Sequence, residues 1–111
     1  MLSEALIPCT ASNFETEVIQ SPVIVVVDFW AEWCNPCKMM VPALEQIATE
    51  HEACRVVTIN VEEEPELAAR CGVRNFPSLC FFVNGRLRCR KEGILTKADI
   101  LRKLDKLSAE L

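Results

Sequence analysis

The sequence predicts a single α/β domain over residues 1–111, with a mixed central β-sheet and helices on both faces. Two observations lead to this fold class. In the first half, a helix joins two apolar strands, which is the pattern of a parallel strand–helix–strand unit. In the second half, an Asn-Gly pair separates two strands and indicates an antiparallel hairpin. The sheet should therefore be parallel early in the chain and antiparallel late.

The first predicted elements are a short helix and a buried strand. Ser12 and Glu15 have the spacing of a capping box and predict a helix over residues 12–20. Pro22 follows this segment and disfavours its continuation. Residues 23–30 are nearly all apolar and rich in β-branched side chains, which is typical of a central strand covered on both faces.

A longer helix, a second strand and another short helix come next. Apolar residues at helical spacing predict a helix over residues 34–50, kinked at Pro42 because proline supplies no backbone N–H. Residues 55–61 form the second strand of the parallel unit. Residues 65–71 start with proline and are followed by Gly72, which are the usual signals of a helix start and end.

The chain closes with a hairpin and a helix. Residues 79–83 and 86–90 flank the dipeptide Asn84-Gly85, whose two positions need positive φ in a tight hairpin turn. Thr96 and Asp99 open the last helix. Its apolar stripe consists of Ile100, Leu104, Leu107 and Leu111.

The composition favours an intracellular globular protein. A net charge of -4 and a pI of about 5.0 argue against nucleic acid or an anionic membrane as the main partner, since both attract clustered Lys and Arg. Residues 1–8 lack the features of a signal segment, and the longest apolar run, residues 23–27, is too short to span a bilayer. A reducing cytoplasm is the expected location, which also suits an odd total of seven cysteines.

One pair of cysteines, Cys34 and Cys37, has the spacing of a reactive motif, and it lies where a buried strand meets a helix. The N–H groups and the positive dipole end of a helix start favour a thiolate. We therefore expect Cys34 to be the attacking thiol. Cys37 should be less exposed and should attack the mixed disulfide that Cys34 forms. Pro36 limits the loop between them.

The alternative for this pair is half of a tetrahedral zinc site. Such a site needs a second close pair of ligands. The remaining cysteines are scattered along the chain, and His51 is its one histidine. The motif therefore favours redox chemistry without a metal.

Residues 27–39, VDFWAEWCNPCKM, closely resemble the active-site segment of the thioredoxin family, in a C-N-P-C variant of the bacterial type. Pro42, residues 75–78 (NFPS), the Asn-Gly turn and Gly93 match the family in the same order, so the resemblance covers nearly the whole chain. It implies the thioredoxin fold. It also implies a protein-disulfide reductase that cycles between a dithiol and a disulfide and donates electrons to redox enzymes.

The resemblance implies further site residues. Asp28 would be a buried acid with a raised pKa that exchanges a proton with Cys37, the alternative being a strand-end aspartate in water. Pro77 would be a cis-proline opposite the dithiol. Trp30 would pack beneath the site, although it is explained equally well as a core residue, as is Phe76. The redox loop would consist of Trp33, Asn35 and Pro36. The substrate groove would be bordered by Trp33, Gly72, Asn75, Phe76 and Gly93.

The chain departs from the family at three positions. Asn35 and Asn75 stand where glycine is usual, and Thr58 stands where a buried lysine is frequent. No catalytic group is lost. The changes concern the redox potential, the path of the proton and the choice of partner.

The resemblance also implies partners. A thioredoxin reductase would supply electrons from NADPH, and the chain itself has no nicotinamide or flavin fingerprint, so no bound cofactor is expected. Disulfide-containing proteins would be the substrates of a monomer. Two alternatives stay open: a dedicated oxidant or isomerase, and a binding module that uses the groove while the dithiol is dispensable. The set Cys34, Cys37, Asp28 and Pro77 favours an enzyme.

Two hypotheses concern the spare cysteines. Cys71, at a helix end, is either exposed enough for glutathionylation or cross-linking of two chains, or a buried inert thiol. If the hairpin has a two-residue turn and a regular register, Cys80 lies directly opposite Cys89 and the two thiols touch. The pair would then either fill the core or form an auxiliary disulfide, and a β-bulge would separate it.

Overall fold

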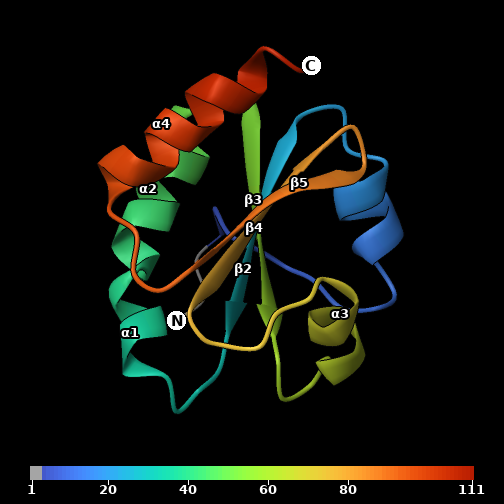
Figure 1. Ribbon diagram of the computed structural model, residues 1–111, viewed down its shortest axis with the longest axis vertical. Helices are drawn as coiled ribbons and strands as arrows, with labels where there is room; N and C mark the ends of the chain where they lie inside the picture. Colours follow the sequence, from blue (N-terminus) through green and yellow to red (C-terminus); the bar gives the residue numbers. More distant parts are fainter. Residues whose placement is uncertain (1–3) are drawn as a thin grey trace.

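The computed structural model describes residues 4–111, which fold around a five-stranded sheet (Figure 1). The strand order is β1-β3-β2-β4-β5. β1 and β2 run parallel to β3, whereas β4 runs antiparallel to β2 and β5, so the predicted mixed sheet is confirmed. The elements in chain order are β1 (Ile7–Pro8), the π-helical turn η1 (Glu15–Ile19), β2 (Ile24–Trp30), α1 (Asn35–Met39), α2 (Val41–Glu50), β3 (Cys54–Asn60), α3 (Pro65–Arg70), β4 (Ser78–Val83), β5 (Arg86–Glu92) and α4 (Lys97–Ser108).

Helices cover both faces of the sheet, as predicted, and each face has its own apolar core (Figure 1). Along β2 the side chains alternate, with Val25 and Val27 in the first core and Ile24 and Val26 in the second. The first core also receives side chains from η1 and α3, and the second from α2 and α4. Every residue of β2 is buried, so this strand runs through the middle of the molecule toward the cysteine motif.

The capping box predicted at Ser12 is wrong. The Ser12 hydroxyl bonds the Thr10 hydroxyl at 2.8 Å, and the Asn13 side chain accepts from the Thr10 N–H at 2.7 Å. These polar side chains close a turn among themselves, so none of them caps the helix. η1 begins only at Glu15, with no side-chain cap.

Other boundaries also differ from the prediction. The predicted helix over residues 34–50 divides at Met40, because Pro42 occupies the first turn of α2, where a missing N–H is tolerated. β1 was not predicted, since two residues are too short to show alternation. α4 has the expected capping box but ends at Ser108, so Leu111 lies beyond the helix and is exposed. None of the helices within residues 4–111 is long and apolar enough to cross a membrane.

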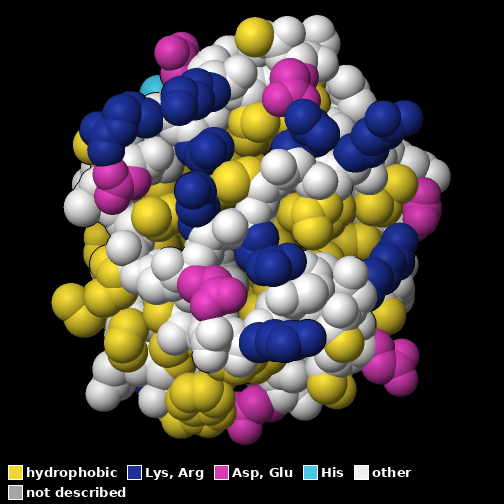
Figure 2. Space-filling model, viewed as in Figure 1, with side chains coloured by type: hydrophobic (Ala, Val, Ile, Leu, Met, Phe, Trp, Pro, Cys, Tyr) yellow, Lys and Arg dark blue, Asp and Glu magenta, His cyan; other side chains and the backbone are white. Residues whose placement is uncertain are grey.

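β5 is an edge strand, and all but one of its residues are exposed. It is strongly basic in an acidic chain. Eight of the twelve Lys and Arg residues lie on β5 and α4, and Figure 2 shows them over this face of the molecule. They are Arg86, Arg88, Arg90 and Lys91 on β5 and Lys97, Arg102, Lys103 and Lys106 on α4.

The turn between β4 and β5 is the predicted Asn-Gly turn. Asn84 and Gly85 both have positive φ, 51° and 78°. Gly85 also lies against η1, since a Cβ atom there would be 2.6 Å from the Ile19 carbonyl oxygen. Both the backbone angle and this close approach therefore require glycine at position 85.

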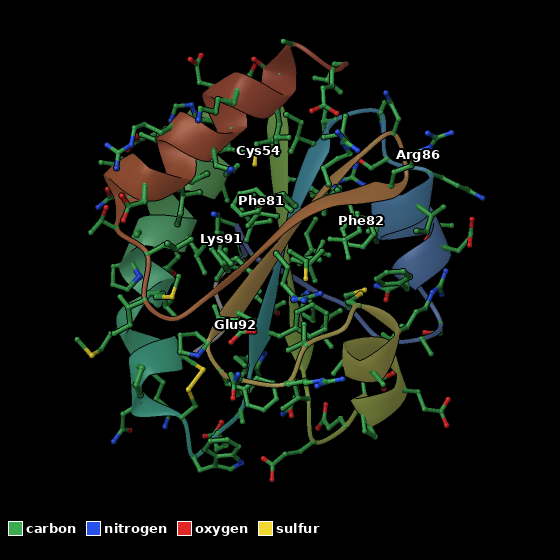
Figure 3. The ribbon with its side chains drawn as sticks, viewed as in Figure 1. Cys54, Phe81, Phe82, Arg86, Lys91 and Glu92 are labelled. Atoms are coloured by element: carbon green, nitrogen blue, oxygen red, sulfur yellow. A yellow bond between two sulfur atoms is a disulfide. The ribbon has the colours of Figure 1, made fainter. Side chains whose placement is uncertain are left out.

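The predicted pairing of Cys80 with Cys89 is wrong. Arg88 is an extra residue in β5 and forms a β-bulge, which shifts the register. Cys80 is consequently buried in the first core, whereas Cys89 packs against the second. Phe81 and Phe82, on either side of the shift, point to opposite sides of the sheet (Figure 3). The observed pairs are Val83–Arg86, Phe82–Leu87, Phe81–Cys89 and Cys80–Arg90.

Candidate active site

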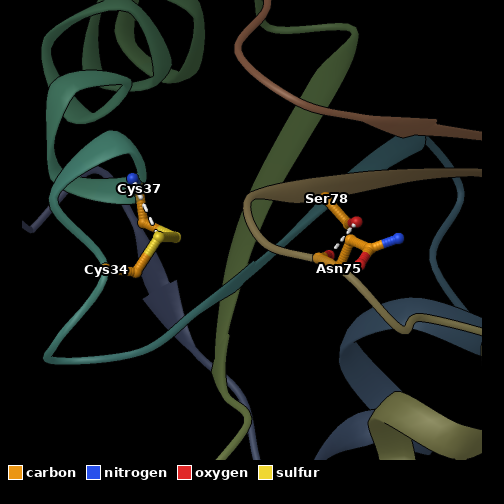
Figure 4. Close-up of a disulfide and its surroundings, with 4 residues drawn as sticks. All are labelled: Cys34, Cys37, Asn75 and Ser78. Carbon is orange, nitrogen blue, oxygen red and sulfur yellow. Dashed lines mark hydrogen bonds between the residues drawn. A yellow bond between two sulfur atoms is a disulfide. The ribbon is translucent and has the colours of Figure 1, made fainter.

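The two cysteines of the motif form a disulfide where the loop after β2 enters α1 (Figure 4). Their Cα atoms lie 5.3 Å apart. Cys34 is the N-cap of α1, and its Sγ accepts a hydrogen bond from the Cys37 backbone N–H at 3.2 Å. This N–H is one of the donors that a helix leaves unpaired at its start. After reduction the same donor favours the thiolate form of Cys34.

The disulfide is buried, while the loop between its cysteines is exposed. Cys34 is 2% exposed and Cys37 is 0% exposed, so the predicted difference between them is small in the disulfide form. Pro36 occupies the first turn of α1, and Asn35 beside it points into solvent. A partner must therefore approach the sulfur atoms across this exposed loop.

Asp28 is buried in β2, as predicted. Neither of its carboxylate oxygens has a hydrogen-bond partner within the described chain. Its neighbours in the sheet are Leu79 on β4 and Thr58 on β3. Burial without a compensating cation raises the pKa of Asp28 from 3.8 to about 7. The carboxyl group can therefore exchange a proton near neutral pH.

The turn before β4 contains the predicted cis peptide bond, between Phe76 and Pro77. Hydrogen bonds hold this turn on both sides. The Ser78 hydroxyl donates to the Asn75 carbonyl oxygen at 2.5 Å (Figure 4), and the Gly93 N–H donates to the Pro77 carbonyl oxygen at 2.9 Å. The Asn75 side chain also donates to the carboxylate of Glu92 at 2.7 Å. Asn75, which stands where the family usually has glycine, thus links the turn to β5 through this hydrogen bond.

An aromatic contact brings the cis-proline turn and the cysteine loop together. The rings of Trp33 and Phe76 meet edge to face, with centroids 5.9 Å apart. Trp33 is 62% exposed, whereas Phe76 is half-buried. Trp30 lies in the first core together with Cys34 and Cys37. The two tryptophans therefore have different surroundings, one in the core that includes the disulfide and one at the surface.

Two exposed apolar residues lie close in sequence to the site and were not predicted from it. Met39 ends α1 and is 69% exposed, and Ile94 follows Gly93 and is 53% exposed. Met39 could have been identified from the sequence, because it is a large apolar residue at the end of the motif helix. Ile94 could not have been identified in this way, because its exposure depends on where β5 ends.

Gly72, predicted at the groove, lies beside Arg90. A Cβ atom at Gly72 would be 2.6 Å from Arg90 Nη1. No described contact joins Gly72 to the disulfide, whereas Asn75, Phe76 and Gly93 are joined to one another through the cis-proline turn. Within residues 4–111, no three His, Cys, Asp or Glu side chains are grouped as a metal ion would require.

Comparison with known proteins agrees with this arrangement. The thioredoxin family model matches residues 5–106. Among similar proteins, the thioredoxin of Acidithiobacillus ferridurans is 42% identical over 94% of this chain and 97% of its own length. The thioredoxins of Rickettsia bellii and Pseudomonas aeruginosa are 39% and 35% identical over 83% and 94% of this chain, and over 89% and 97% of their own lengths. The chain belongs to the thioredoxin family and is a thiol–disulfide oxidoreductase.

Proposed function

We propose that Cys34 begins the reduction of a protein disulfide and that Cys37 completes it. The Cys34 thiolate attacks one sulfur of the substrate, so that a mixed disulfide forms and the first substrate thiolate leaves. The Cys37 thiol then loses its proton and attacks Cys34. This step forms the Cys34–Cys37 disulfide and releases the second substrate thiolate. Two electrons pass from the enzyme dithiol to the substrate.

Asp28 is the proposed acceptor of the Cys37 proton. Two properties of Asp28 support this role: its side chain is completely buried, and its pKa is about 7. A carboxyl group with such a pKa is partly ionised at neutral pH, so it can take up a proton and release it again. Thr58 beside it carries no charge, so nothing at that position holds the carboxylate ionised.

The proposed docking groove borders the Trp33–Phe76 contact, with Pro77, Asn75 and Gly93 on the turn behind it. Exposed aromatic surface next to a buried disulfide suits an extended segment of a protein substrate. Gly72 belongs to this groove in the proposal, through the α3–β4 loop that it begins. Trp33, Asn35 and Pro36 form the redox loop.

Electrons are proposed to come from NADPH through a thioredoxin reductase, which holds the nicotinamide and flavin groups. The protein is proposed to act as a monomer in the cytoplasm, with disulfide-containing proteins as its substrates. Its reduced state is then restored by exchange of two electrons between the reductase dithiol and the Cys34–Cys37 disulfide.

The observation that carries the proposal is the Cys34–Cys37 disulfide at the start of α1, beside the exposed ring of Trp33. Reduction of insulin disulfides, followed by NADPH oxidation with a thioredoxin reductase, tests it. Cys37→Ser should abolish turnover, because the mixed disulfide is no longer resolved. Cys89→Ser, outside the motif, is the matched control and should keep full turnover. A Cys37→Ser variant that turns over normally would show that the dithiol is not the working group.

A further inference from the structure

Three cysteines outside the motif share the first core. Cys9 follows β1, Cys71 follows α3 and Cys80 lies in β4, and all three are buried. The disulfide exchange proposed above uses none of them. Residues far apart in the sequence thus place three thiols on one face of the sheet.

Cys71 and Cys80 are hydrogen-bonded to each other through their side chains. The bond lowers the pKa of Cys71 and raises the pKa of Cys80. Burial opposes the lowering at Cys71, while Arg70 and Arg90 support it. The other buried thiols behave differently, because burial raises the pKa of both Cys9 and Cys54 to about 12. The pKa of Cys71 is therefore shifted in the direction that favours its thiolate.

Arg90 holds positive charge beside this pair. It lies opposite Cys80 in the β4–β5 ladder, and its Nη1 donates to the Cys71 carbonyl oxygen at 3.3 Å. Glycine at position 72 makes room for the guanidinium, since a Cβ atom there would lie 2.6 Å from Arg90 Nη1. The β-bulge at Arg88 produces this placement by setting Arg90 opposite Cys80. A fixed cation beside a thiol favours its reactive, ionised form.

A cavity of about 170 Å³ gives access to Cys71. Arg70, Phe14, Phe82 and Leu87 also line it. A single water molecule needs only on the order of 15 Å³ of such space, so a cavity of this volume also has room for a small hydroperoxide. A small oxidant can therefore approach the Cys71 side, whereas Cys80 does not line this cavity.

We propose that Cys71 and Cys80 form a second redox pair, in which Cys71 reacts with a small hydroperoxide and Cys80 closes a disulfide. The Cys71 thiolate attacks the outer peroxide oxygen, the O–O bond breaks, and a sulfenic acid forms while an alcohol or water leaves. Cys80 then loses its proton and attacks Cys71, so that the S–S bond forms and hydroxide leaves as water. Two thiols are oxidised and one peroxide is reduced. The new bond joins the two ends of residues 72–79, the segment that carries Phe76 and Pro77.

Peptide mapping tests the partners of this bond. In a Cys34→Ser/Cys37→Ser chain, the spare cysteines are the remaining thiols. The reduced protein is treated with hydrogen peroxide, blocked with N-ethylmaleimide and digested with trypsin. Trypsin places Cys71 on residues 71–74, Cys80 on 75–86, Cys89 on 89–90 and Cys9 on 1–38. We expect 71–74 joined to 75–86, released by dithiothreitol. A link from 71–74 to 1–38, a link from 75–86 to 89–90, or no link would overturn the proposal.

The order of the two steps is tested with dimedone, which traps sulfenic acids. With Cys80→Ser added to the same chain, the adduct should accumulate on residues 71–74. It should exceed the adduct on Cys89, which is more exposed but does not line the cavity, by about tenfold. With Cys71→Ser, residues 75–86 should stay free of the adduct, and with Cys89→Ser the 71–74 to 75–86 link should persist. An adduct on Cys80 before Cys71 would overturn the assigned order of the two steps.

The circular dichroism spectrum checks that each variant is folded. The peptide mapping itself needs no change at either cysteine of the pair.

Discussion

At the scale of single residues, Asp28 gives the sharpest expectation about the reaction. Its carboxyl group is buried and has no hydrogen-bond partner among the described residues. Asp28→Asn should keep the fold, since the amide has nearly the same shape. It should slow insulin reduction at neutral pH by up to about 100-fold, the lower end of general acid–base contributions. Steady-state rates measured from about pH 6 to 8 should vary for the wild type, whose Asp28 has a pKa of about 7, and should be flatter for the variant.

Thr58 offers a control for this experiment. Thr58→Val changes a neighbour of Asp28 in the sheet without removing the acid, so the pH profile should keep its shape. A wild-type rate that is level across this pH range, or equal rates for wild type and Asp28→Asn, would remove Asp28 from the mechanism.

Asn35 should tune the redox potential. Its side chain is exposed in the disulfide form and lies one residue after Cys34. In the reduced form its amide can donate to the Cys34 thiolate, which stabilises the dithiol and makes it more oxidising. Asn35→Gly should therefore lower the potential by about 30 mV, equivalent to about 1.4 kcal/mol. Equilibration with glutathione or a reference dithiol measures this shift. An increase would show that the hydrogen bond has the opposite effect.

At the scale of secondary-structure elements, the start of α4 is held by a reciprocal pair of hydrogen bonds. The Asp99 N–H donates to the Thr96 hydroxyl at 3.1 Å, and the Thr96 N–H donates to the Asp99 carboxylate at 3.0 Å. Thr96→Ala should lower the free energy of unfolding by about 1 kcal/mol, because it removes the cap. Urea denaturation measures this change. Thr49→Ala, at an exposed position inside α2, should change it by less than about 0.5 kcal/mol, and equal losses would argue against a capping role.

Some features of the secondary-structure elements were predictable from sequence patterns, and others were not. The Asn84-Gly85 turn and the Thr96–Asp99 cap were predictable, because each depends on a few residues at fixed spacing. The bulge at Arg88 was not, since an inserted residue leaves no mark in a strand of exposed, charged side chains. The Cys71–Cys80 contact could not be predicted for a different reason, because it depends on the tertiary packing of α3 against the sheet.

At the scale of the whole molecule, the burial of Asp28 links stability to pH. Between its ordinary pKa of 3.8 and its folded value of about 7, the unfolded chain has lost the proton that the folded chain keeps. Unfolding then releases a proton, so stability falls as pH rises through this window. The loss is complete above about pH 7 and amounts to at most about 4 kcal/mol. Below about pH 3.8 the group is protonated in both states and has no effect.

Guanidinium denaturation of wild type and Asp28→Asn at about pH 4.5 and pH 8 measures this effect. The variant should gain little at the lower pH and up to about 4 kcal/mol over wild type at the higher pH. A difference in unfolding free energy between the two proteins that is the same at both pH values would mean that Asp28 ionises as readily in the folded chain as in the unfolded one.

The overall architecture was predictable because it follows from long buried patterns. The apolar run of β2 and the helix after it specify a parallel unit, and the hairpin turn specifies the antiparallel strands. Among the site residues, Cys34 and Cys37 were found from their spacing and their place between a strand and a helix, whereas the cis-proline at position 77 needed the family resemblance. The Trp33–Phe76 contact joins two distant loops, so no local pattern could reveal it.

The positive charge of β5 has a consequence for how copies of the protein meet. A strand at the border of a sheet leaves backbone N–H and C=O groups unpaired, and these can recruit a strand from another molecule and start aggregation. On one border of this sheet the edge strand, β1, has only two residues. On the other, Arg86, Arg88, Arg90 and Lys91 make the approach of a second β5 repulsive, and the bulge at Arg88 bends the strand away from a flat partner. Both borders of the sheet are thus protected from pairing with the sheet of another copy.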